Sequence, residues 1–265
     1  MQKKVIVVKI GGSTLGNHDT TLEDLVELQK KGRSMVVIHG GAKVTTEWLA
    51  RLGIPTSFVN GLRVTDAETM KVVAATLGGL VNKELVVAIQ ALGGRAVGLS
   101  GCDGNLLWAN VKSPETRYVG EIVAVDPAPL RLLLKAGYMP VVAPVSFGSV
   151  AGRVMLLNVN GDTAAGEIAA ALAAEKLIFL TDVDGIHDNS KQVFQKLSLA
   201  EAKDMIASGV ASGGMIPKIE ASLRALTTTR VVRIIDGRAA HALRDDITGK
   251  AQQITKSGGT TIVAE

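Results

Sequence analysis

Residues 5–12 read VIVVKIGG, an apolar run of β-branched residues that ends in a lysine and two glycines. A continuous apolar run of this length is typical of a strand that is buried on both faces, as strands of parallel sheets are. Two later segments repeat the form: residues 35–41 read MVVIHGG, and residues 177–185 read LIFLTDVDG. Each of these strands is therefore expected to end in a turn that carries glycine or polar residues.

Helical and strand patterns alternate along the rest of the chain. Apolar residues at helical spacing predict helices over residues 22–28, 48–52, 66–92, 129–136 and 162–174, and a further helix that begins near Lys218. Short apolar runs predict strands over residues 96–99, 140–143, 231–235 and 260–263, and residues 106–126 predict hairpins. The predicted class is α/β, with a three-layer, open, mainly parallel sheet, helices on both faces, and β-hairpins that make it mixed.

Two glycines, Gly78 and Gly79, interrupt the longest helical pattern. Because glycine has no Cβ atom, this pair predicts that a neighbouring backbone approaches the helix closely there. No internal repeat or low-complexity linker divides the chain, so we expect lobes that share one continuous sheet.

The composition excludes several classes of protein. With 265 residues, 47% of them hydrophobic and 20% charged, the chain can bury a large core and is not disordered. No apolar run approaches the roughly 20 residues of a membrane span, and the N-terminus carries no secretory signal. Cys102 is the single cysteine, so an internal disulfide is excluded, which fits a cytoplasmic protein. The net charge of +4 suits an anionic ligand, whereas the scattered basic residues and few aromatic ones argue against nucleic acid.

Paired glycines follow the first two predicted strands. In an open parallel sheet, ligands bind at the carboxyl ends of the strands. Gly11 and Gly12, and then Gly40 and Gly41, stand at these ends, where glycine lets backbone N–H groups turn toward an anion. A tight strand-to-helix turn explains either pair alone, but two pairs at successive strand ends favour phosphate or carboxylate binding. Neither turn has the Walker A or the dinucleotide-binding pattern, so a different kind of phosphate site is predicted.

Three charged residues stand at unusual places. Lys9 ends an apolar strand, where a buried ammonium group is costly unless it is paired, although an exposed strand end explains it equally well. Asp162 precedes an alanine-rich helix, where aspartate is also a good N-cap. Lys218 stands at the start of a helix, where a lysine opposes the helix dipole and a nearby anion would compensate. The three form a site only if the fold brings them together.

Six short motifs occur in order: VVKIGG at 7–12, VIHGG at 37–41, GLRVT at 61–65, NVNGDTAA at 158–165, LTDVDGI at 180–186 and GGMIPK at 213–218. Together they resemble the amino acid kinase family over essentially the whole chain. Within that family the chain is similar to the branch that phosphorylates the side-chain carboxylate of N-acetyl-L-glutamate with ATP, a step of arginine biosynthesis. The resemblance implies N-acetyl-L-glutamyl 5-phosphate as the product.

The resemblance also implies a role for each matched position. Lys9 and Lys218 would stabilise the transferring phosphoryl group, and Asp162 would hold both ammonium groups. The implied substrate-binding residues are Gly40, Gly41, Arg63, Asn158 and Asn160. The implied nucleotide-binding residues are Gly11, Gly12, Thr181, Asp182, Val183, Asp184, Gly185, Ile186, Val210, Ala211 and Ser212. Residues 1–175 would form a lobe for the acyl-amino-acid substrate and for dimerisation, and residues 176–265 a nucleotide-binding lobe.

The residue types agree with this chemistry. The attacking carboxylate is already ionised at pH 7, so the site needs no general base. The site must instead neutralise charge and align the reactants, which two lysines, backbone N–H groups and Mg²⁺ can do. We assign no protein ligand to the metal, because Mg²⁺ is expected to arrive with ATP and to be held mainly by phosphate oxygens.

Two departures from the family pattern carry expectations of their own. Ala42 stands where the family often has a third glycine, and its methyl group is expected to crowd or reshape the substrate loop. The arginine-inhibited, hexameric members carry a helix before the first strand, whereas here the strand begins near Val5. The expectation is a homodimer that is insensitive to arginine.

Two alternatives to this activity remain open. One is a carrier-protein-linked aminoadipate or glutamate kinase of the same family, for which the motif around Arg63 and the ending of the motif at Lys218 are less suitable. The other is a non-catalytic sensor with a kinase fold. The presence of Lys9, Asp162 and Lys218 argues against a sensor.

Overall fold

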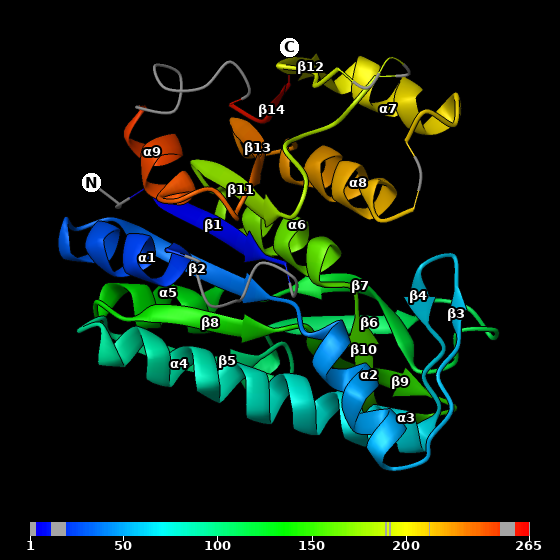
Figure 1. Ribbon diagram of the computed structural model, residues 1–265. Helices are drawn as coiled ribbons and strands as arrows, with labels where there is room; N and C mark the ends of the chain where they lie inside the picture. Colours follow the sequence, from blue (N-terminus) through cyan, green and yellow to red (C-terminus); the bar gives the residue numbers. More distant parts are fainter. Residues whose placement is uncertain are drawn as a thin grey trace.

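The structure is a computed structural model that describes residues 4–11, 20–188, 190, 192–211, 213–249 and 258–264. Two of the predicted nucleotide-binding residues, Gly12 and Ser212, lie outside these described residues. The elements form one large sheet with helices on both sides and a small barrel beside it (Figure 1).

Strands from both halves of the chain form one eight-stranded sheet. In spatial order they are β12 (Lys196–Ser198), β14 (Thr260–Val263), β13 (Val231–Asp236), β11 (Lys176–Thr181), β1 (Val5–Ile10), β2 (Ser34–His39), β8 (Met139–Ala143) and β5 (Ala96–Ser100). Every neighbouring pair is parallel except β13 and β14. The predicted α/β class and the continuous sheet are confirmed. The sheet is mixed because of β14, and not because of interposed hairpins as the sequence suggests.

Helices cover both faces of this sheet. On one face lie α1 (Thr21–Lys30), α4 (Asn82–Ala91) and α9 (Ala242–Thr248), and on the other lie α5 (Ala128–Lys135), α6 (Gly161–Leu172), α7 (Leu199–Ala207) and α8 (Met215–Ala225). The remaining helical elements are α2 (Ala42–Arg51), α3 (Ala67–Val73), the π-helix η1 (Ala74–Val81) and the 3₁₀ turn η2 (Asp103–Asn105).

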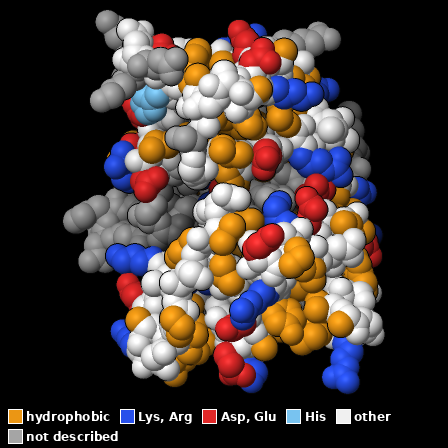
Figure 2. All heavy atoms as spheres, turned by 90° about the vertical axis from the view of Figure 1, so that its right-hand side faces the viewer, with side chains coloured by type: hydrophobic (Ala, Val, Ile, Leu, Met, Phe, Trp, Pro, Cys, Tyr) orange, Lys and Arg blue, Asp and Glu red, His pale blue; other side chains and the backbone are white. Residues whose placement is uncertain are grey.

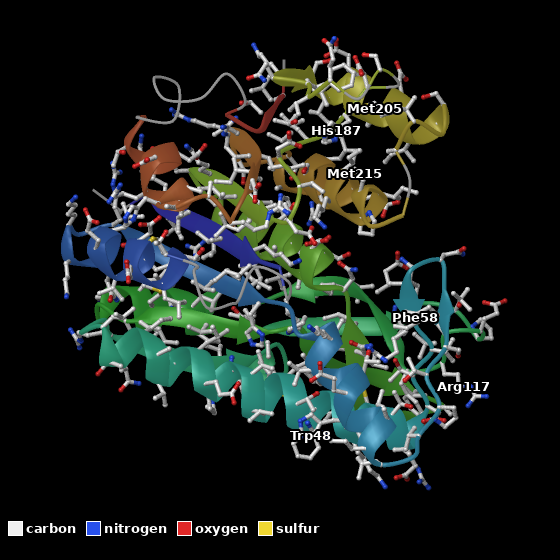
Figure 3. The ribbon with its side chains drawn as sticks, in the orientation of Figure 1. Trp48, Phe58, Arg117, His187, Met205 and Met215 are labelled. Atoms are coloured by element: carbon white, nitrogen blue, oxygen red, sulfur yellow. The ribbon has the colours of Figure 1, made fainter. Side chains whose placement is uncertain are left out.

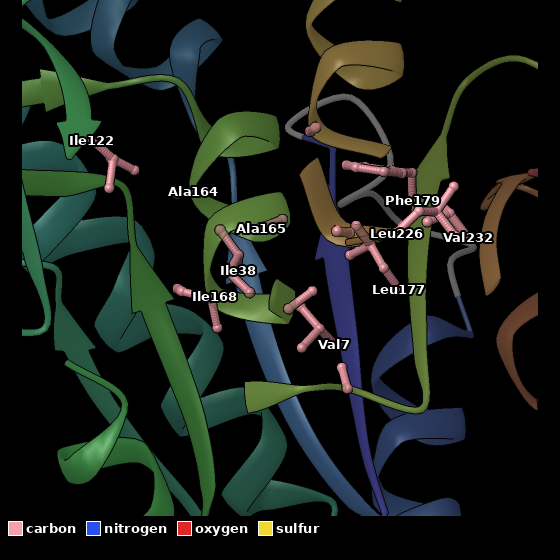
Figure 4. Packing of buried hydrophobic residues seen from close by; sticks show 14 of the residues in the cluster. Val7, Ile38, Ile122, Ala164, Ala165, Ile168, Leu177, Phe179, Leu226 and Val232 are labelled. Carbon is pink, nitrogen blue, oxygen red and sulfur yellow. The ribbon is translucent and has the colours of Figure 1, made fainter. Parts of the chain in front are cut away.

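The central strand β1 is buried on both faces. Its even-numbered residues pack with α1 and α4, whereas Val7 packs with α6, because successive side chains of a strand point to opposite faces. Figure 4 shows Val7 and Ile38 beside Ala165 and Ile168 of α6. Lys9 is two residues beyond Val7, so its side chain also points to the side of α6.

Four strands form a closed barrel beside the sheet: β10 (Arg153–Val159), β7 (Val119–Val125), β6 (Leu107–Val111) and β9 (Val145–Val150). The sequence predicts the antiparallel pair β6 and β7 as a hairpin, but it does not predict β9 and β10. Gly148 lies inside β9, where glycine weakens a strand pattern. A Cβ atom at Gly148 would stand 1.7 Å from the carbonyl oxygen of Ala109, so the close contact in the barrel requires glycine.

A short hairpin projects at the carboxyl end of the sheet. It consists of β3 (Phe58–Val59) and β4 (Leu62–Arg63), which are joined by Asn60 and Gly61 (Figure 1). Both loop residues have positive φ, 48° and 77°, as a type I′ turn requires. The hairpin brings Arg63 close to the start of α2.

The longest helix runs from Ala67 to Ala91 through α3, η1 and α4, and by length and composition it could span a membrane. One side of it packs inside the protein, whereas Leu80 and Val87 are exposed. Met70 and Leu77 belong to a cluster with Val145 of the barrel, and Leu85 and Ile89 belong to the cluster below β1. The helix is therefore amphipathic in its packing, with one side in the core and the other at the surface.

The predicted close approach at Gly78 and Gly79 is wrong. A Cβ atom at either position would meet nothing within 4 Å. The close approach occurs at Gly166 in α6, where a Cβ atom would lie 2.5 Å from the carbonyl oxygen of Ala221 in α8. The small residues of α6 are visible in the sequence, but their partner is far along the chain and has no local pattern that reveals it.

Candidate active site

The carboxyl ends of β1 and β2 and the start of α6 meet at a cavity of about 330 Å³. Figure 2 shows this side of the molecule, where the surface is indented between its upper and lower parts. The cavity brings together every predicted substrate-binding residue and two of the three predicted catalytic ones. These lining residues are Lys9, Gly40, Gly41, Arg63, Asn158, Asn160 and Asp162.

Asp162 joins the two lysines that the sequence singles out. Its Oδ1 lies 2.7 Å from Lys9 Nζ, and its Oδ2 lies 3.0 Å from Lys218 Nζ. The three side chains are only 8–16% exposed. Burial raises the pKa of Asp162, but the ammonium groups of Lys9 and Lys218 outweigh burial and hold this pKa below its ordinary value. Lys9 is thus a buried and paired ammonium group, which settles the question that its position in the strand leaves open.

The start of α6 fixes the position of Asp162. Asn160 is the N-cap, and its Oδ1 accepts hydrogen bonds from the backbone N–H groups of Asp162 and Thr163 at 2.8 and 3.1 Å. The N-cap interpretation of Asp162 is therefore wrong, because Asn160 fills that role two residues earlier. With the cap supplied by Asn160, the carboxylate of Asp162 is available to the lysines.

Lys218 reaches Asp162 because α6 and α8 pack unusually closely. The contact at Gly166 and Ala221 lets the two helices approach, and it lies about one turn from the two charged residues. Lys218 stands in the first turn of α8, where the positive end of the helix dipole disfavours an ammonium group. The compensating anion that the sequence predicts is Asp162.

The turn after β2 has room only for glycine at position 41. Gly41 has φ 154°, and a Cβ atom there would stand 2.6 Å from Leu77 Cδ2. Gly40 donates its N–H to the carbonyl oxygen of Ile10 at 3.0 Å, so this N–H is committed to the sheet. The Gly41 N–H has no acceptor among the described residues, which leaves it as the donor that an anion in the cavity can use.

Arg63 is buried beside this turn, with 7% of its surface exposed. Its Nη2 donates to the carbonyl oxygen of Ala42 at 2.9 Å and to Thr46 Oγ1 at 2.6 Å. The ring of Phe58 stacks on the guanidinium at 4.9 Å, and Figure 3 shows Phe58 on the projecting hairpin. Burial lowers the pKa of Arg63. Ala42 is exposed at the start of α2, and its carbonyl oxygen anchors the arginine.

Two buried or partly buried threonines, Thr65 and Thr46, support the site without a sequence pattern that marks them. Thr65 is fully buried, accepts a hydrogen bond from Asn158 Nδ2 at 3.1 Å, and donates to the carbonyl oxygen of Arg63 at 2.8 Å. Thr46 binds Arg63, as described above. The motif at 61–65 contains Thr65, but Thr46 lies in a helix whose pattern shows only that it is polar. Both contact predicted substrate-binding residues, Arg63 and Asn158, and neither lines the cavity itself.

The predicted nucleotide-binding residues lie apart from this cavity. Residues 181–186 follow β11, and residues 210–211 follow α7, on the side of the sheet's carboxyl ends. Ile186 and Ala211 are buried in the core, and Ile186 donates its N–H to Thr260 Oγ1 at 2.8 Å. In the described part of this loop, the side chains of Asp182, Val183 and Asp184 are at least partly exposed. These positions remain predictions, since none of them lines the cavity.

Lys9, Asp162 and Arg63 line one cavity, and Asp162 links Lys9 to Lys218. Ammonium and guanidinium groups gathered in this way are suited to bind anionic groups such as phosphoryl oxygens. The fold and site define the chain as a phosphotransferase of the α/β class. The model of the amino acid kinase family matches residues 4–236. The chain belongs to that family, as the sequence motifs predict.

Known relatives agree with this assignment. An acetylglutamate kinase from Dehalococcoides mccartyi is 43% identical over 265 residues, covering 98% of this chain and 95% of the relative. An acetylglutamate kinase from Cereibacter sphaeroides is 44% identical over 263 residues, covering 98% and 87%. The crystal structure of carbamate kinase from Giardia lamblia bound to AMP-PNP has a TM-score of 0.72 at 14% identity and covers 99% of both chains, which shows the shared fold alone.

Proposed function

We propose that this chain transfers the γ-phosphoryl group of ATP to the side-chain carboxylate of N-acetyl-L-glutamate and so makes N-acetyl-L-glutamyl 5-phosphate for arginine biosynthesis. The observation that carries the proposal is the Lys9–Asp162–Lys218 cluster at the cavity that contains Arg63. The names of relatives that align with nearly the whole chain support the same substrate.

The transfer needs charge neutralisation more than proton transfer. The acceptor carboxylate is ionised and can attack the γ-phosphorus directly, with ADP as the leaving group. Lys9 lines the cavity, and Lys218 shares Asp162 with it, so we propose that the N–H donors that these two ammonium groups keep free stabilise the phosphoryl oxygens. Asp162 holds the two ammonium groups at one place although they come from opposite ends of the chain.

Arg63 is suited to bind a carboxylate of the acceptor. Its guanidinium is fixed by Ala42 and Thr46 on one edge and by Phe58 on its face. A planar fork that is held in this way pairs with a carboxylate with little further loss of side-chain freedom. Asn158, which lines the same cavity, adds an amide group for the acceptor's polar atoms.

ATP is the phosphoryl donor that the family membership implies, and we propose that Mg²⁺ arrives with it. Both oxygens of Asp162 face ammonium groups, so this carboxylate is not available as a metal ligand. No group of three or more His, Cys, Asp or Glu side chains suited to a metal occurs in the described part of the chain. These residues fit a Mg²⁺ ion that is held mainly by phosphate oxygens and neutralises their charge.

We also propose a division of labour between the lobes. Residues 1–175 bind the acyl amino acid and form the dimer contact, and residues 176–265 bind the nucleotide. The remaining elements of the proposal are a homodimer in the cytoplasm that arginine does not inhibit. Dimerisation and arginine insensitivity are independent of the proposed phosphoryl transfer, so each of them is tested by its own experiment.

A coupled assay of ADP release with the full-length protein, ATP and Mg²⁺ tests the activity, with N-acetyl-L-glutamate, L-glutamate and L-2-aminoadipate compared side by side. We expect turnover with N-acetyl-L-glutamate and at least about 100-fold lower kcat/KM with the two free amino acids. Turnover that requires aminoadipate attached to a carrier protein would instead support the alternative kinase. Inhibition by micromolar arginine, or a mass in solution that differs from a dimer, would contradict the proposals on regulation and assembly.

A further inference from the structure

His39 is a fully buried polar residue at the end of β2, directly before the glycine turn. Its Nδ1 lies 2.7 Å from the carbonyl oxygen of Gly40, and its Nε2 lies 3.2 Å from Nδ2 of Asn82 in α4. His39 does not line the cavity, but Gly40 and Gly41 do. The residue therefore stands behind the substrate turn rather than in it.

The contacts of Asn82 decide which nitrogen of His39 carries the proton. Asn82 Nδ2 faces two carbonyl oxygens, that of Val141 at 2.9 Å and that of Leu99 at 3.3 Å, and carbonyl oxygens only accept hydrogen bonds. Asn82 Oδ1 accepts a hydrogen bond from Lys83 Nζ at 3.0 Å. The amide orientation is thus fixed, so its nitrogen and not its oxygen faces His39 Nε2, and its two N–H groups are shared among the two carbonyl oxygens and Nε2.

Because the carbonyl oxygen of Gly40 can only accept a hydrogen bond and an amide donor faces Nε2, the proton of the neutral imidazole is on Nδ1. This N–H is directed at the carbonyl oxygen of Gly40. In a trans peptide, a carbonyl group and the next residue's N–H point in opposite directions. Binding the Gly40 carbonyl on the inside of the protein therefore turns the Gly41 N–H the other way, toward the cavity.

The next peptide group is held in the same manner. The carbonyl oxygen of Gly41 accepts hydrogen bonds from the backbone N–H of Thr45 at 3.0 Å and from its Oγ1 at 3.2 Å. Thr45 Oγ1 in turn lies 2.9 Å from Thr76 Oγ1 in η1. Both carbonyl groups of the glycine turn are thus bound from the core side, one by a histidine and one by a threonine, and both supports are anchored on the long helix.

We propose that His39 and Asn82 are a positioning pair for phosphoryl transfer: the Nδ1–H of His39, held in this tautomer by Asn82, orients the peptide between Gly40 and Gly41 so that the Gly41 N–H donates to the reacting phosphoryl or acceptor oxygen. This rests on the proposed function, since it assigns a positioning role within that reaction. A merely space-filling role would be met by an apolar residue, whereas the pair here is a buried polar contact with a defined donor direction.

The first test is the tautomer, which does not depend on activity. The ¹⁵N chemical shifts of the imidazole nitrogens in full-length protein report it, with His39→Leu used to assign the signals among the four histidines. We expect the neutral Nδ1–H form at pH 7. An Nε2–H form or a charged ring would overturn the proposal, even if the protein is an active kinase.

The second test uses kinetics of His39→Leu and His39→Asn. Leucine removes the donor, whereas the asparagine amide nitrogen stands at the same number of bonds from the backbone as Nδ1 and can replace it. We expect His39→Leu to lower kcat about 10- to 100-fold with KM for both substrates within about threefold, since an oriented backbone donor acts mainly on the transition state. His39→Asn should recover at least about tenfold of this loss.

A control variant separates this effect from general destabilisation. Thr229 is buried in the segment between α8 and β13, and its Oγ1 donates to the carbonyl oxygen of Ala169, so Thr229→Val removes a buried hydrogen bond away from the cavity. It should lower Tm and leave kcat within about twofold. If His39→Leu has a kcat within twofold of the parent, or if His39→Asn is no better than His39→Leu, the pair has no positioning role. An inactive parent protein would contradict the proposed function, while the tautomer would still decide the arrangement of His39.

Discussion

Asp162 and Asp246 are two buried carboxylates, each paired with two cations, for which we propose different roles. Asp162 lies between Lys9 and Lys218, and Asp246 lies between Arg233 Nε at 2.6 Å and Lys176 Nζ at 3.0 Å. Each acid is less than 10% exposed and each is bound to two cations.

The two clusters differ in the number of N–H donors on the cations that have no acceptor within the protein. Arg233 also donates to Thr261 and to the carbonyl oxygen of Gly258, so its guanidinium is bonded on every side within the protein. Lys9, by contrast, contacts no acceptor but Asp162 among the described residues and keeps further N–H donors beside the cavity. We therefore expect the Asp246 cluster to act only on stability, and the Asp162 cluster, which keeps free donors at the cavity, to act on phosphoryl transfer.

Replacing each acid by its amide gives the largest contrast. Asp162→Asn should lower kcat by at least about 10²-fold, because the two ammonium groups then repel each other and lose their common position. Asp246→Asn should leave kcat within about threefold but lower stability by about 3 kcal/mol, since it leaves two buried cations unpaired. Coupled ADP-release kinetics and thermal unfolding of both variants check this. Equal losses of kcat in the two variants would remove the distinction between the clusters.

Replacing one cation of each cluster sharpens the comparison. Lys218→Met should lower kcat by about 10²-fold and change KM for ATP much less, because Lys218 acts mainly on the transition state. Lys176→Met keeps the parent kcat and lowers Tm by a few degrees, since Arg233 still binds Asp246. Steady-state kinetics with both substrates varied decides the point, and a near-native kcat in Lys218→Met would show that Lys218 has no part in the transfer.

Low pH is expected to lower the free energy of unfolding through His39. The carbonyl oxygen of His39 lies close to Gly161 at the start of α6, the helix that carries Asp162. Burial lowers the pKa of His39 to about 4. In the unfolded chain a histidine takes up its proton near pH 6.5, so the free energy of unfolding falls as pH falls from 6.5 toward 4, by up to about 3 kcal/mol. The depressed pKa of Asp162 has the same sign at lower pH, where stability is lost as that carboxylate is protonated.

Urea unfolding of the parent and of His39→Leu between pH 7 and 4.5 measures this contribution. The variant should lack most of the loss of stability over that range, whatever its stability at pH 7. A parallel pH dependence in the two proteins would mean that another group is responsible.

The smallest effects are expected from two helical glycines. Gly166 lets α6 and α8 approach at the Asp162 cluster, whereas Gly79 contacts neither cluster. Gly166→Ala places a methyl group against the backbone of Ala221, so we expect a loss of about 2 kcal/mol and a lower kcat, because Asp162 and Lys218 are separated. Gly79→Ala, in a helix with open space around it, should instead gain up to about 1 kcal/mol with unchanged kcat. Thermal unfolding and kinetics of the pair test both signs, and a stabilising Gly166→Ala would contradict the close helix contact.

Much of the fold follows from local pattern. The apolar runs that end at Lys9 and Thr181 form adjacent strands of the sheet, as continuous burial predicts. The barrel strands β9 and β10 are not predicted from local pattern, because residues 153–156 are exposed and because Gly148, which weakens a strand pattern, is required by a close contact with Ala109. A local pattern reports burial and backbone freedom, but it does not say which distant atoms cause them.

The candidate site likewise has features that the sequence predicts and features that only the tertiary structure shows. The sequence by itself indicates that Lys9 and Lys218 stand where an ammonium group is either exposed or paired with an anion, and it predicts that Gly40 and Gly41 form a turn at a strand end. Only the tertiary structure decides that Asp162 is the anion shared by both lysines and that Asn160, not Asp162, caps α6. The reason is physical: the cost of a buried charge or an unfilled hydrogen bond is visible at one residue, whereas the partner that removes the cost is chosen by packing between segments far apart in the chain.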